Sequence, residues 1–400
     1  MCWVLSALCL VRTSGIITAK HEAPDTKHQA QRTKHVVPSP STNHYLIVGQ
    51  GLAGSLLAHA LLARGQAVCV VEGALGSSSR VAAGVCNPVT GRKPTRTWLA
   101  DELFGYLHDF YPRLEAELGT RFFHPTTVYR PYRSIEEQND FIARTARPEL
   151  EAFLTEVADH AAYAPLIQNP LGGLLTRRAA WVEVPRLLDA LGERLRARGV
   201  FRATRFDYAD LTLDPAGAHW EGTRFDAVVC CEGVFGAQNP YFGYLPFQPV
   251  KGQTLTVCIE GPEPPGIVNQ NGWLLPLGGG RYRVGATYEW DDLTEVPTAR
   301  GRADLVATLD ALLRVPYRIE DQRAGIRPAV RGRRPLLGRH PAYPALVIFN
   351  GLGSKGVSLG PYFANQLAAF LVDGKELAPA VNIDRFDSLS YRQNENPRTE

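Results

Sequence analysis

Two glycine-rich stretches near opposite ends of the chain have the residue types and spacing to do chemistry. The first, residues 49–54, reads Gly-Gln-Gly-Leu-Ala-Gly between an apolar run and a helical pattern, and Glu72 ends the next apolar run. In such a turn the glycines allow a tight bend, close approach of a pyrophosphate and packing of the helix on the strand. Free amides at the helix start then bind phosphate charge, and the acid accepts hydrogen bonds from ribose hydroxyls. The sequence therefore predicts a dinucleotide site, for FAD or NAD, at Gly49, Gly51, Leu52, Ala53, Gly54 and Glu72.

The second stretch favours a flavin. Residues 347–356 read Val-Ile-Phe-Asn-Gly-Leu-Gly-Ser-Lys-Gly before another helical pattern, but no strand ending in an acid follows. A second adenosine site is therefore disfavoured. A helix start beside Lys355 suits the negative charge that develops on a reduced flavin ring, although a structural turn with a solvated lysine is the alternative. The predicted FAD contacts here are Gly351, Gly353, Ser354, Lys355 and Gly356.

The elements that must position these turns follow from the apolar periodicity. A strand at residues 44–48, a helix at 53–63 and a strand at 67–72 make a βαβ start, which is typical of a doubly wound parallel sheet. Residues 248–287 are rich in Val, Thr and Tyr with glycine turns, which predicts an antiparallel sheet. The other predicted helices are 97–118, 135–157, 185–198, 300–313 and 361–372, and the other predicted strands are 126–132, 201–208, 210–214, 225–231 and 345–350.

The chain thus leaves the nucleotide-binding unit twice and returns twice. We expect an α/β fold in which a doubly wound parallel-sheet FAD-binding domain is interleaved with a smaller α+β substrate domain built on an antiparallel sheet. The predicted FAD-binding domain comprises residues 44–100, 171–247 and 322–400, and the predicted substrate domain comprises 101–170 and 248–321. Residues 1–43 are predicted to be a disordered leader.

The amino-acid composition narrows the possible partners and the cellular compartment of the protein. The 400 residues are 45% hydrophobic, which is typical of a globular protein. The net charge of +3 is too small to indicate that the whole molecule binds nucleic acid or an anionic membrane. No apolar run approaches the length of a membrane span, and a secretory signal at residues 1–11 is the less favoured interpretation. Seven cysteines without a C-x-x-C pair favour reduced thiols and a cytoplasmic protein. The histidines lack metal-ligand spacing, so no metal is expected.

Four segments carry a family resemblance. They are residues 47–54; 78–88; 273–276 with 285–287; and 324–328 with 335–338 and the final glycine turn. In their order and spacing the chain resembles the D-amino-acid oxidase superfamily of FAD-dependent oxidoreductases, from Tyr45 to about Phe386. Within it the sequence looks like glycine oxidase and like the FAD module of the bifunctional wobble-uridine tRNA-modification enzyme.

The resemblance implies roles for further residues. Ser79, Arg80, Ala83 and Gly84 would line the flavin and its pyrophosphate, and residues 228–233, ending in Gly233, would pass the adenine. Arg327 would pair with a substrate carboxylate, a task that suits a bidentate guanidinium, with a structural salt bridge as the alternative. Trp273 and Tyr288 would face the substrate, although such aromatic residues more often belong to a core.

The implied activity is oxidation of an amino acid or secondary amine by hydride transfer to flavin N5, with O2 or an unknown acceptor taking the electrons. FAD would be non-covalent, because no cysteine lies near the final turn. Ser354 stands where glycine oxidase resemblance predicts an arginine, which puts glycine in doubt as substrate. After Arg327-Pro328 the related enzymes usually have an Asp-Gly pair, whereas this chain has Arg331-Gly332-Arg333-Arg334. This departure puts the charge of the loop, and with it the charge of the substrate, in doubt. Flavin-dependent modification of a tRNA wobble uridine and a non-catalytic flavin-binding protein stay open as alternatives.

Overall fold

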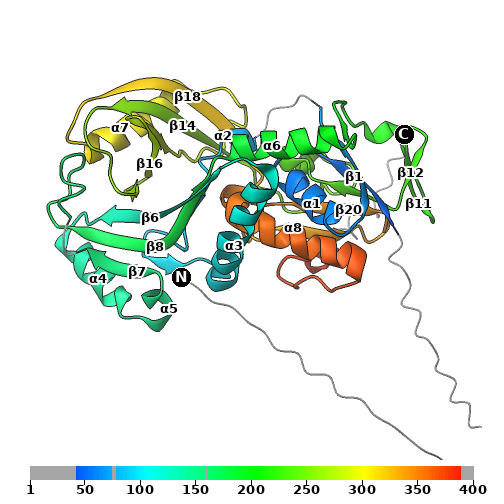
Figure 1. Cartoon of the computed structure of the whole chain (residues 1–400), viewed down its shortest axis with the longest axis horizontal. Helices are drawn as coiled ribbons and strands as arrows, with labels where there is room; N and C mark the ends of the chain where they lie inside the picture. The colour runs from blue at the N-terminus through cyan, green and yellow to red at the C-terminus, as the bar shows by residue number, and fades with distance from the viewer. Residues whose placement is uncertain (1–41, 74–77, 158–159, 389–400) are drawn as a thin grey trace, which may run out of the picture. The chain divides into compact units, whose positions relative to one another are not determined.

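Two large sheets organise the molecule. The computed structural model describes residues 42–73, 78–157 and 160–388, which belong to one compact unit (Figure 1). One sheet has six strands in the order β19-β20-β13-β1-β2-β9, and the other has nine strands and is mostly antiparallel. The α/β architecture predicted from the sequence, with a parallel sheet and an antiparallel one, is confirmed. Most of the predicted leader, residues 1–41, lies outside the described residues.

The six-stranded sheet is buried on both faces, which explains its continuous apolar strands. One face is covered by four helices, α1 (Leu52–Leu62), α3 (Ala100–Leu118), α6 (Val184–Ala197) and α8 (Gly356–Asp373). A small sheet of β10, β11 and β12 covers the other face. All neighbouring strands are parallel except β19 and β20. The strands are β1 (His44–Val48), β2 (Ala67–Val71), β9 (Phe201–Arg202), β13 (Ala227–Cys230), β19 (Leu336–Arg339) and β20 (Leu346–Asn350); the cover is β10 (Leu211–Asp214), β11 (Gly217–Trp220) and β12 (Thr223–Phe225).

The nine-stranded sheet builds the other half of the described chain. Helix α7 (Ala299–Leu312) packs on it, with Leu305 and Leu309 buried against β14 and its neighbours. Pairing is antiparallel except between β6 and β15. The strands are β3 (Val85–Cys86), β6 (Phe123–Pro131), β7 (Leu154–Val157), β8 (Gly173–Val182), β14 (Val250–Ile259), β15 (Ile267–Asn269), β16 (Trp273–Gly278), β17 (Arg281–Gly285) and β18 (Tyr317–Arg327). A separate hairpin, β4 (Val89–Thr90) and β5 (Thr95–Arg96), lies between β3 and α3 in the sequence.

One predicted helix was wrong. Residues 135–157 form α4 (Ile135–Thr145), the short α5 (Pro148–Glu151) and β7. Proline lacks an amide hydrogen and clashes with the preceding helical turn, so Pro148 begins a new helix and does not continue the old one. The last segment then pairs with β8 and adds a strand to the sheet.

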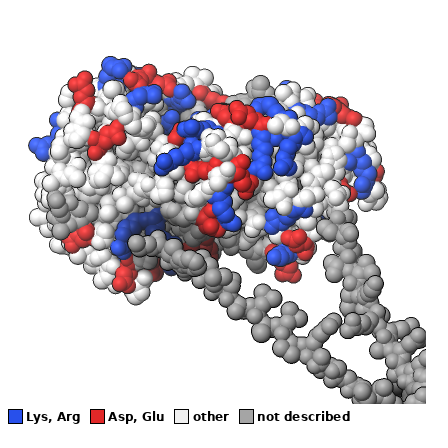
Figure 2. Space-filling model, in the orientation of Figure 1, with Lys and Arg blue, Asp and Glu red and all other residues white. Residues whose placement is uncertain are grey.

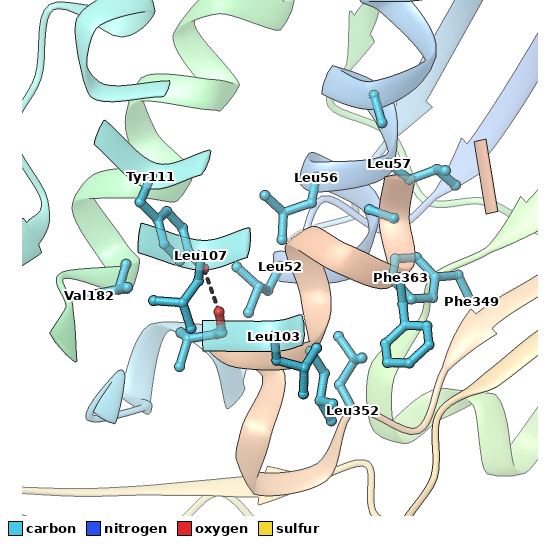
Figure 3. Packing of buried hydrophobic residues seen from close by; sticks show 14 of the residues in the cluster. Leu52, Leu56, Leu57, Leu103, Leu107, Tyr111, Val182, Phe349, Leu352 and Phe363 are labelled. Carbon is cyan, nitrogen blue, oxygen red and sulfur yellow. Dashed lines mark hydrogen bonds between the residues drawn. The ribbon is translucent and has the colours of Figure 1, made fainter. Parts of the chain in front are cut away.

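The last helix starts earlier than predicted. Helix α8 (Gly356–Asp373) contains Pro361 in its second turn, although the sequence predicted a start at that proline. The ring leaves the Val357 carbonyl without its helical donor. The hydroxyl of Tyr111, on α3 (Ala100–Leu118), donates to that carbonyl at 2.7 Å within a buried leucine-rich cluster (Figure 3). A tertiary contact therefore stabilises a helix that local rules would end.

The predicted domain boundaries stay a prediction. Helix α3, given to the substrate domain from residue 101, packs on α8 and places Leu103 and Leu107 beside Leu52 and Leu56 of α1 (Leu52–Leu62) (Figure 3). Strand β8, given to the FAD-binding domain, pairs with β3, β6 and β7. Among residues 42–73, 78–157 and 160–388, no helix has both the length and the apolar character needed to cross a membrane.

Gly54 fixes the distance between α1 and the turn before it. A β-carbon at this position would overlap the Gly49 carbonyl oxygen and lie 3.2 Å from Ile47 Cγ2. Because backbone cannot move aside cheaply, we expect Gly54→Ala to lower the free energy of unfolding by about 3 kcal/mol or more. Gly105→Ala in α3, where a β-carbon meets nothing within 4 Å, should raise it by about 0.5–1 kcal/mol. Urea unfolding of both variants measures the difference, and equal stabilities would contradict this reading.

Candidate cofactor and substrate site

One cavity of about 430 Å³ collects residues from both ends of the chain. Its wall comes from the ends of β1, β2, β13 and β20, from the start of α8, and from strands β14, β16 and β18 of the nine-stranded sheet. Of the residues predicted from the sequence, the wall contains Gly49, Gly51, Leu52, Ala53, Glu72, Ser79, Ala83, Gly84, Gly233, Trp273, Tyr288, Arg327, Gly353, Ser354 and Gly356. Four predicted residues lie off the wall: Gly54, Arg80, Gly351 and Lys355.

The first glycine turn opens the start of α1 toward the cavity. Gly49 has φ +103°, its amide donates to Val71 O at 2.9 Å, and a β-carbon there would lie 2.6 Å from Cys231 O. Gly51 caps α1 without a side-chain hydrogen bond. The Leu52 amide donates to Ser79 Oγ at 3.3 Å. A helix start with few protein acceptors is a ready site for a phosphate group.

The acid at the end of β2 is held in place by the turn itself. Glu72 Oε2 accepts the Gln50 amide at 2.5 Å and lies on the cavity wall. Burial raises the pKa of Glu72, while the Gln50 amide and then Arg80 act to lower it. The Arg80 side chain points to Asp189, with a 2.8 Å ion pair between two partly exposed groups. The geometry orients a carboxylate toward the cavity, where it can accept from hydroxyl groups.

The second glycine turn brings another helix start to the same cavity. Gly353, Ser354 and Gly356 line it, and α8 begins there without a side-chain cap. Gly351 lies behind the turn, where a β-carbon would meet Val330 Cγ1 at 3.1 Å. The dipole of α8 therefore adds positive potential at this end of the cavity.

Lys355 stands beside the turn but not on the wall. Its Nζ donates to Thr97 Oγ1 at 3.3 Å and to Thr90 Oγ1 at 3.5 Å. Burial lowers the pKa of Lys355, and the nearby Arg334 and Arg333 lower it further. The structure brings this lysine close to the start of α8 and holds its amine against two hydroxyls.

Arg327 ends β18 with its guanidinium lying over Gly252 of β14, where a β-carbon would overlap it. Its Nη1 donates to Thr287 O at 3.2 Å and to Lys251 O at 3.3 Å. Within the described part of the chain no carboxylate lies within 4.0 Å of this side chain. Partial burial lowers the pKa of Arg327, so the guanidinium is a partly desolvated cation with no carboxylate beside it among the described residues. Such a group can bind a carboxylate through two parallel hydrogen bonds.

Two aromatic side chains share the cavity wall with this arginine, and one of them contacts it. Tyr288 lies 4.5 Å from the Arg327 Cζ, measured to the ring centroid, and is 56% exposed. Trp273 starts β16 opposite Gly285 of β17, which has no side chain to displace the indole. Both line the cavity. The cavity therefore offers a small carboxylate a charged side chain, Arg327, with an aromatic ring in contact with it.

The comparisons with known proteins agree with this geometry. Residues 44–370 match the DAO family, described as FAD dependent oxidoreductase. The chain belongs to this family. The resemblance drawn from the sequence is confirmed, and the chain is a flavoprotein-family oxidoreductase.

Several relatives of this DAO-family protein are known. The tRNA 5-methylaminomethyl-2-thiouridine biosynthesis bifunctional protein MnmC of Azoarcus sp. (strain BH72) is 25% identical over 92% of this chain, which spans 64% of that relative's length. Glycine oxidase of Bacillus subtilis (strain 168) is 27% identical over 52% of this chain and 58% of its own. The crystal structure of glycine oxidase from Geobacillus kaustophilus has a TM-score of 0.70 at 23% identity, covering 86% of this chain and 98% of that one. At that identity the structural likeness shows the fold alone.

FAD fits the donors that this family member presents. Two uncapped helix starts face one cavity, and a β-carbon at Gly51 would meet only Ser79 Oγ, at 3.5 Å, so the space beyond it is cavity. The volume is within the range of roughly 300–1,000 Å³ that ligand sites occupy. Amides at one end suit a pyrophosphate, and Glu72 suits a ribose.

Glu232 belongs to the segment 228–233 that was expected to pass the adenine, but no role was predicted for its carboxyl group or for its partners. Glu232 follows β13, and its Oε2 accepts from Asn239 Nδ2 at 2.6 Å. The same amide nitrogen lies 2.5 Å from Tyr208 Oη. Burial raises the pKa of Glu232, against the opposing effects of Asn239 and Tyr208. Its place at the carboxyl end of a parallel strand was the available signal, because ligands bind along that edge.

The raised pKa of Glu232 predicts a pH dependence of stability. A carboxyl whose folded pKa exceeds its unfolded value near 4.5 stabilises the fold most below that value, and the contribution is lost as pH rises through the folded pKa. Glu232→Gln keeps an acceptor for Asn239 but cannot ionise. We expect wild type and variant to unfold alike near about pH 4 and the variant to be more stable near about pH 8. A difference that does not change with pH in chemical unfolding of the apoprotein would refute this.

Proposed function

We propose that this protein oxidises a carboxylate-bearing amine, either an amino acid or a secondary amine, with non-covalently bound FAD. One observation carries the proposal: the Arg327 guanidinium is half-buried on the wall of the cavity that both glycine turns face, with no carboxylate within 4.0 Å among the described residues. A cation that has lost part of its hydration gains from an anion that pairs with it. A substrate carboxylate supplies that anion.

Each group on the wall then has a task. Arg327 fixes the carboxylate and with it the carbon that bears the amine, while Trp273 and Tyr288 exclude water and limit the substrate's orientations. Amides at the start of α1 bind the pyrophosphate, and the start of α8, with Lys355 beside it, places positive potential at the ring end. FAD, when bound, supplies the hydride acceptor at N5.

The electron acceptor, O2 or another, belongs to the same proposal, as does a cytoplasmic location. The five described cysteines are free thiols: Cys69, Cys86, Cys230, Cys231 and Cys258. Burial raises the pKa of Cys86, Cys230 and Cys231, which disfavours the reactive thiolate form. Free cysteines, three of them buried, support a cytosol-like compartment.

A second candidate, modification of a tRNA wobble uridine, is favoured by one group of cations. Arg331, Arg333 and Arg334 have no carboxylate within 4.0 Å in the described part of the chain, and the last lies 4.2 Å from the Trp98 ring. Both Arg333 and Arg334 lie close enough to lower the pKa of Lys355. Elsewhere, on the face in Figure 2, basic and acidic side chains are interspersed. Binding of tRNA that weakens steeply with salt would favour this candidate.

The test is a spectral one. The FAD-loaded protein is mixed anaerobically with a panel of amino acids and N-substituted amino acids, and loss of the flavin absorbance is followed. We expect at least one carboxylate-bearing amine to bleach the flavin, while the matching amine without a carboxylate does not. Bleaching by none of them would leave the third candidate, a non-catalytic flavin-binding protein, as the better account.

A further inference from the structure

Exposed apolar side chains concentrate in one loop, and the first of them, Tyr288, lines the cavity. Seven large apolar residues are exposed in the part of the chain that the structure describes, and four of them lie between β17 and α7. They are Tyr288, 56% exposed, Trp290, 64%, Leu293, 42%, and Val296, 65%. A cluster of this kind on a soluble surface commonly marks a binding site.

The loop is held in place by a buried lysine. Lys251 of β14 is fully buried, and its Nζ donates to Asp292 Oδ2 at 2.5 Å and to Val296 O at 2.6 Å. The hydrogen bond from Lys251 lowers the pKa of Asp292 to about 2, so the carboxylate stays ionised at neutral pH. The backbones of Lys251 and Glu289 exchange two hydrogen bonds, of 2.9 and 3.0 Å.

A buried glutamine anchors both ends of the loop. Gln253 Nε2 donates to Glu289 Oε1 and to Thr298 Oγ1, each at 2.7 Å. Its Oε1 accepts the Thr298 amide at 2.8 Å. The hydrogen bonds of Lys251 and Gln253 fix the backbone of this loop. The apolar side chains are therefore exposed in an ordered loop and not in an unfolded one.

The exposed aromatics continue the cavity wall outward. Tyr288 lines the cavity and lies over Arg327, and the Trp290 ring lies 6.3 Å from the Tyr288 ring with an interplanar angle of 29°. The two rings form an aromatic ledge that starts at the arginine and ends in solvent. A ligand whose carboxylate lies at Arg327 can therefore place a further group on the ledge.

We propose that the aromatic ledge of Tyr288 and Trp290 binds a planar apolar group of the substrate. The inference rests on the proposed function, because it takes the carboxylate position from Arg327. It names the substrate class as an amine that bears both a carboxylate and a bulky apolar substituent, and not a glycine-sized one. Covering an exposed indole with an aromatic ring improves affinity by about tenfold, from removed apolar surface and ring packing together.

The experiment uses two ligands that have a carboxylate but no amine, methoxyacetate and phenoxyacetate. Their dissociation constants for the FAD-loaded protein are measured by the change in flavin absorbance and by tryptophan fluorescence. We expect phenoxyacetate to bind about tenfold tighter than methoxyacetate. Trp290→Ala should remove most of this preference without changing methoxyacetate binding, and Trp290→Phe should keep it. Tyr343→Ala, which removes a 44% exposed aromatic residue outside the loop, is the control and should change neither constant.

The outcomes separate the two claims. Equal binding of both ligands, or a preference that survives Trp290→Ala, overturns the ledge while the carboxylate site at Arg327 stands. Failure of both ligands to bind overturns the proposed function and the ledge with it. If Trp290→Ala converts a dimer to a monomer in sedimentation without altering the preference, the loop contacts a second copy of the chain, and the ledge as a substrate site is overturned.

Discussion

Arg327→Ala is expected to raise the KM for a carboxylate-bearing substrate by about 100-fold or more and to leave bound FAD in place. Two charge-assisted hydrogen bonds in a desolvated site are worth roughly 3–4 kcal/mol together, and every 1.4 kcal/mol is tenfold. The side chain makes its hydrogen bonds to two backbone carbonyls and to no carboxylate among residues 42–73, 78–157 and 160–388. Steady-state kinetics and flavin content of the same preparation measure both effects.

The control for this prediction is Arg327→Lys, which keeps the charge but not the planar fork. It should recover only part of the lost affinity, since a single ammonium cannot make two parallel bonds to one carboxylate. Loss of FAD or of folding in the alanine variant would show instead that the arginine serves the structure. An unchanged KM in a variant that keeps its FAD would show that the arginine does not bind the substrate.

Gly51→Val is expected to fold but to retain almost no FAD. Gly51 has φ −70° and ψ −169°, which any residue can adopt, and a β-carbon there contacts only Ser79 Oγ, at 3.5 Å. The added methyl groups would therefore extend into the space where the backbone must approach the pyrophosphate. The dissociation constant for FAD should rise by about 100-fold or more, because several backbone hydrogen bonds to phosphate are lost. The free energy of unfolding of the apoprotein should fall by only about 1 kcal/mol, because valine is a poorer helix cap than glycine.

The matched control adds the same side chain at another glycine. Gly105→Val lies in α3, where nothing is within 4 Å of the new β-carbon, and it should leave flavin content unchanged. Flavin absorbance per chain after gel filtration gives the comparison. Undiminished flavin in Gly51→Val would remove the pyrophosphate from the first glycine turn.

Local sequence signals predicted the parts of this fold that local chemistry decides. The strand, turn and helix from His44 to Leu62 follow from apolar periodicity and three glycines, and the structure places them as expected. Elsewhere the prediction was wrong for two different reasons. Pro148 is a local helix breaker that the apolar periodicity hid, whereas Tyr111 supports α8 across Pro361 by a tertiary contact that no local window contains.

The candidate site shows the same limit. Glycine patterns located both turns on the cavity wall, but the sequence could not show that Arg327 lacks a carboxylate partner or that the amine of Lys355 contacts Thr97. The cluster around Glu232 depends on Asn239, which is brought back to it by a 3₁₀ turn. The aromatic ledge depends on Lys251, whose partners are more than forty residues away. Hydrogen bonds between residues this far apart in the sequence are set by the fold and leave no pattern in a local stretch of sequence.

The most direct test of the central claim, that two helix starts from opposite ends of the chain hold one flavin, is the absorbance spectrum of the purified protein. The spectrum is recorded as purified and again after incubation with FAD and gel filtration. We predict flavin absorbance that stays with the protein, at one FAD per chain, and is released intact on denaturation. Protein that remains colourless after incubation with FAD would contradict the account.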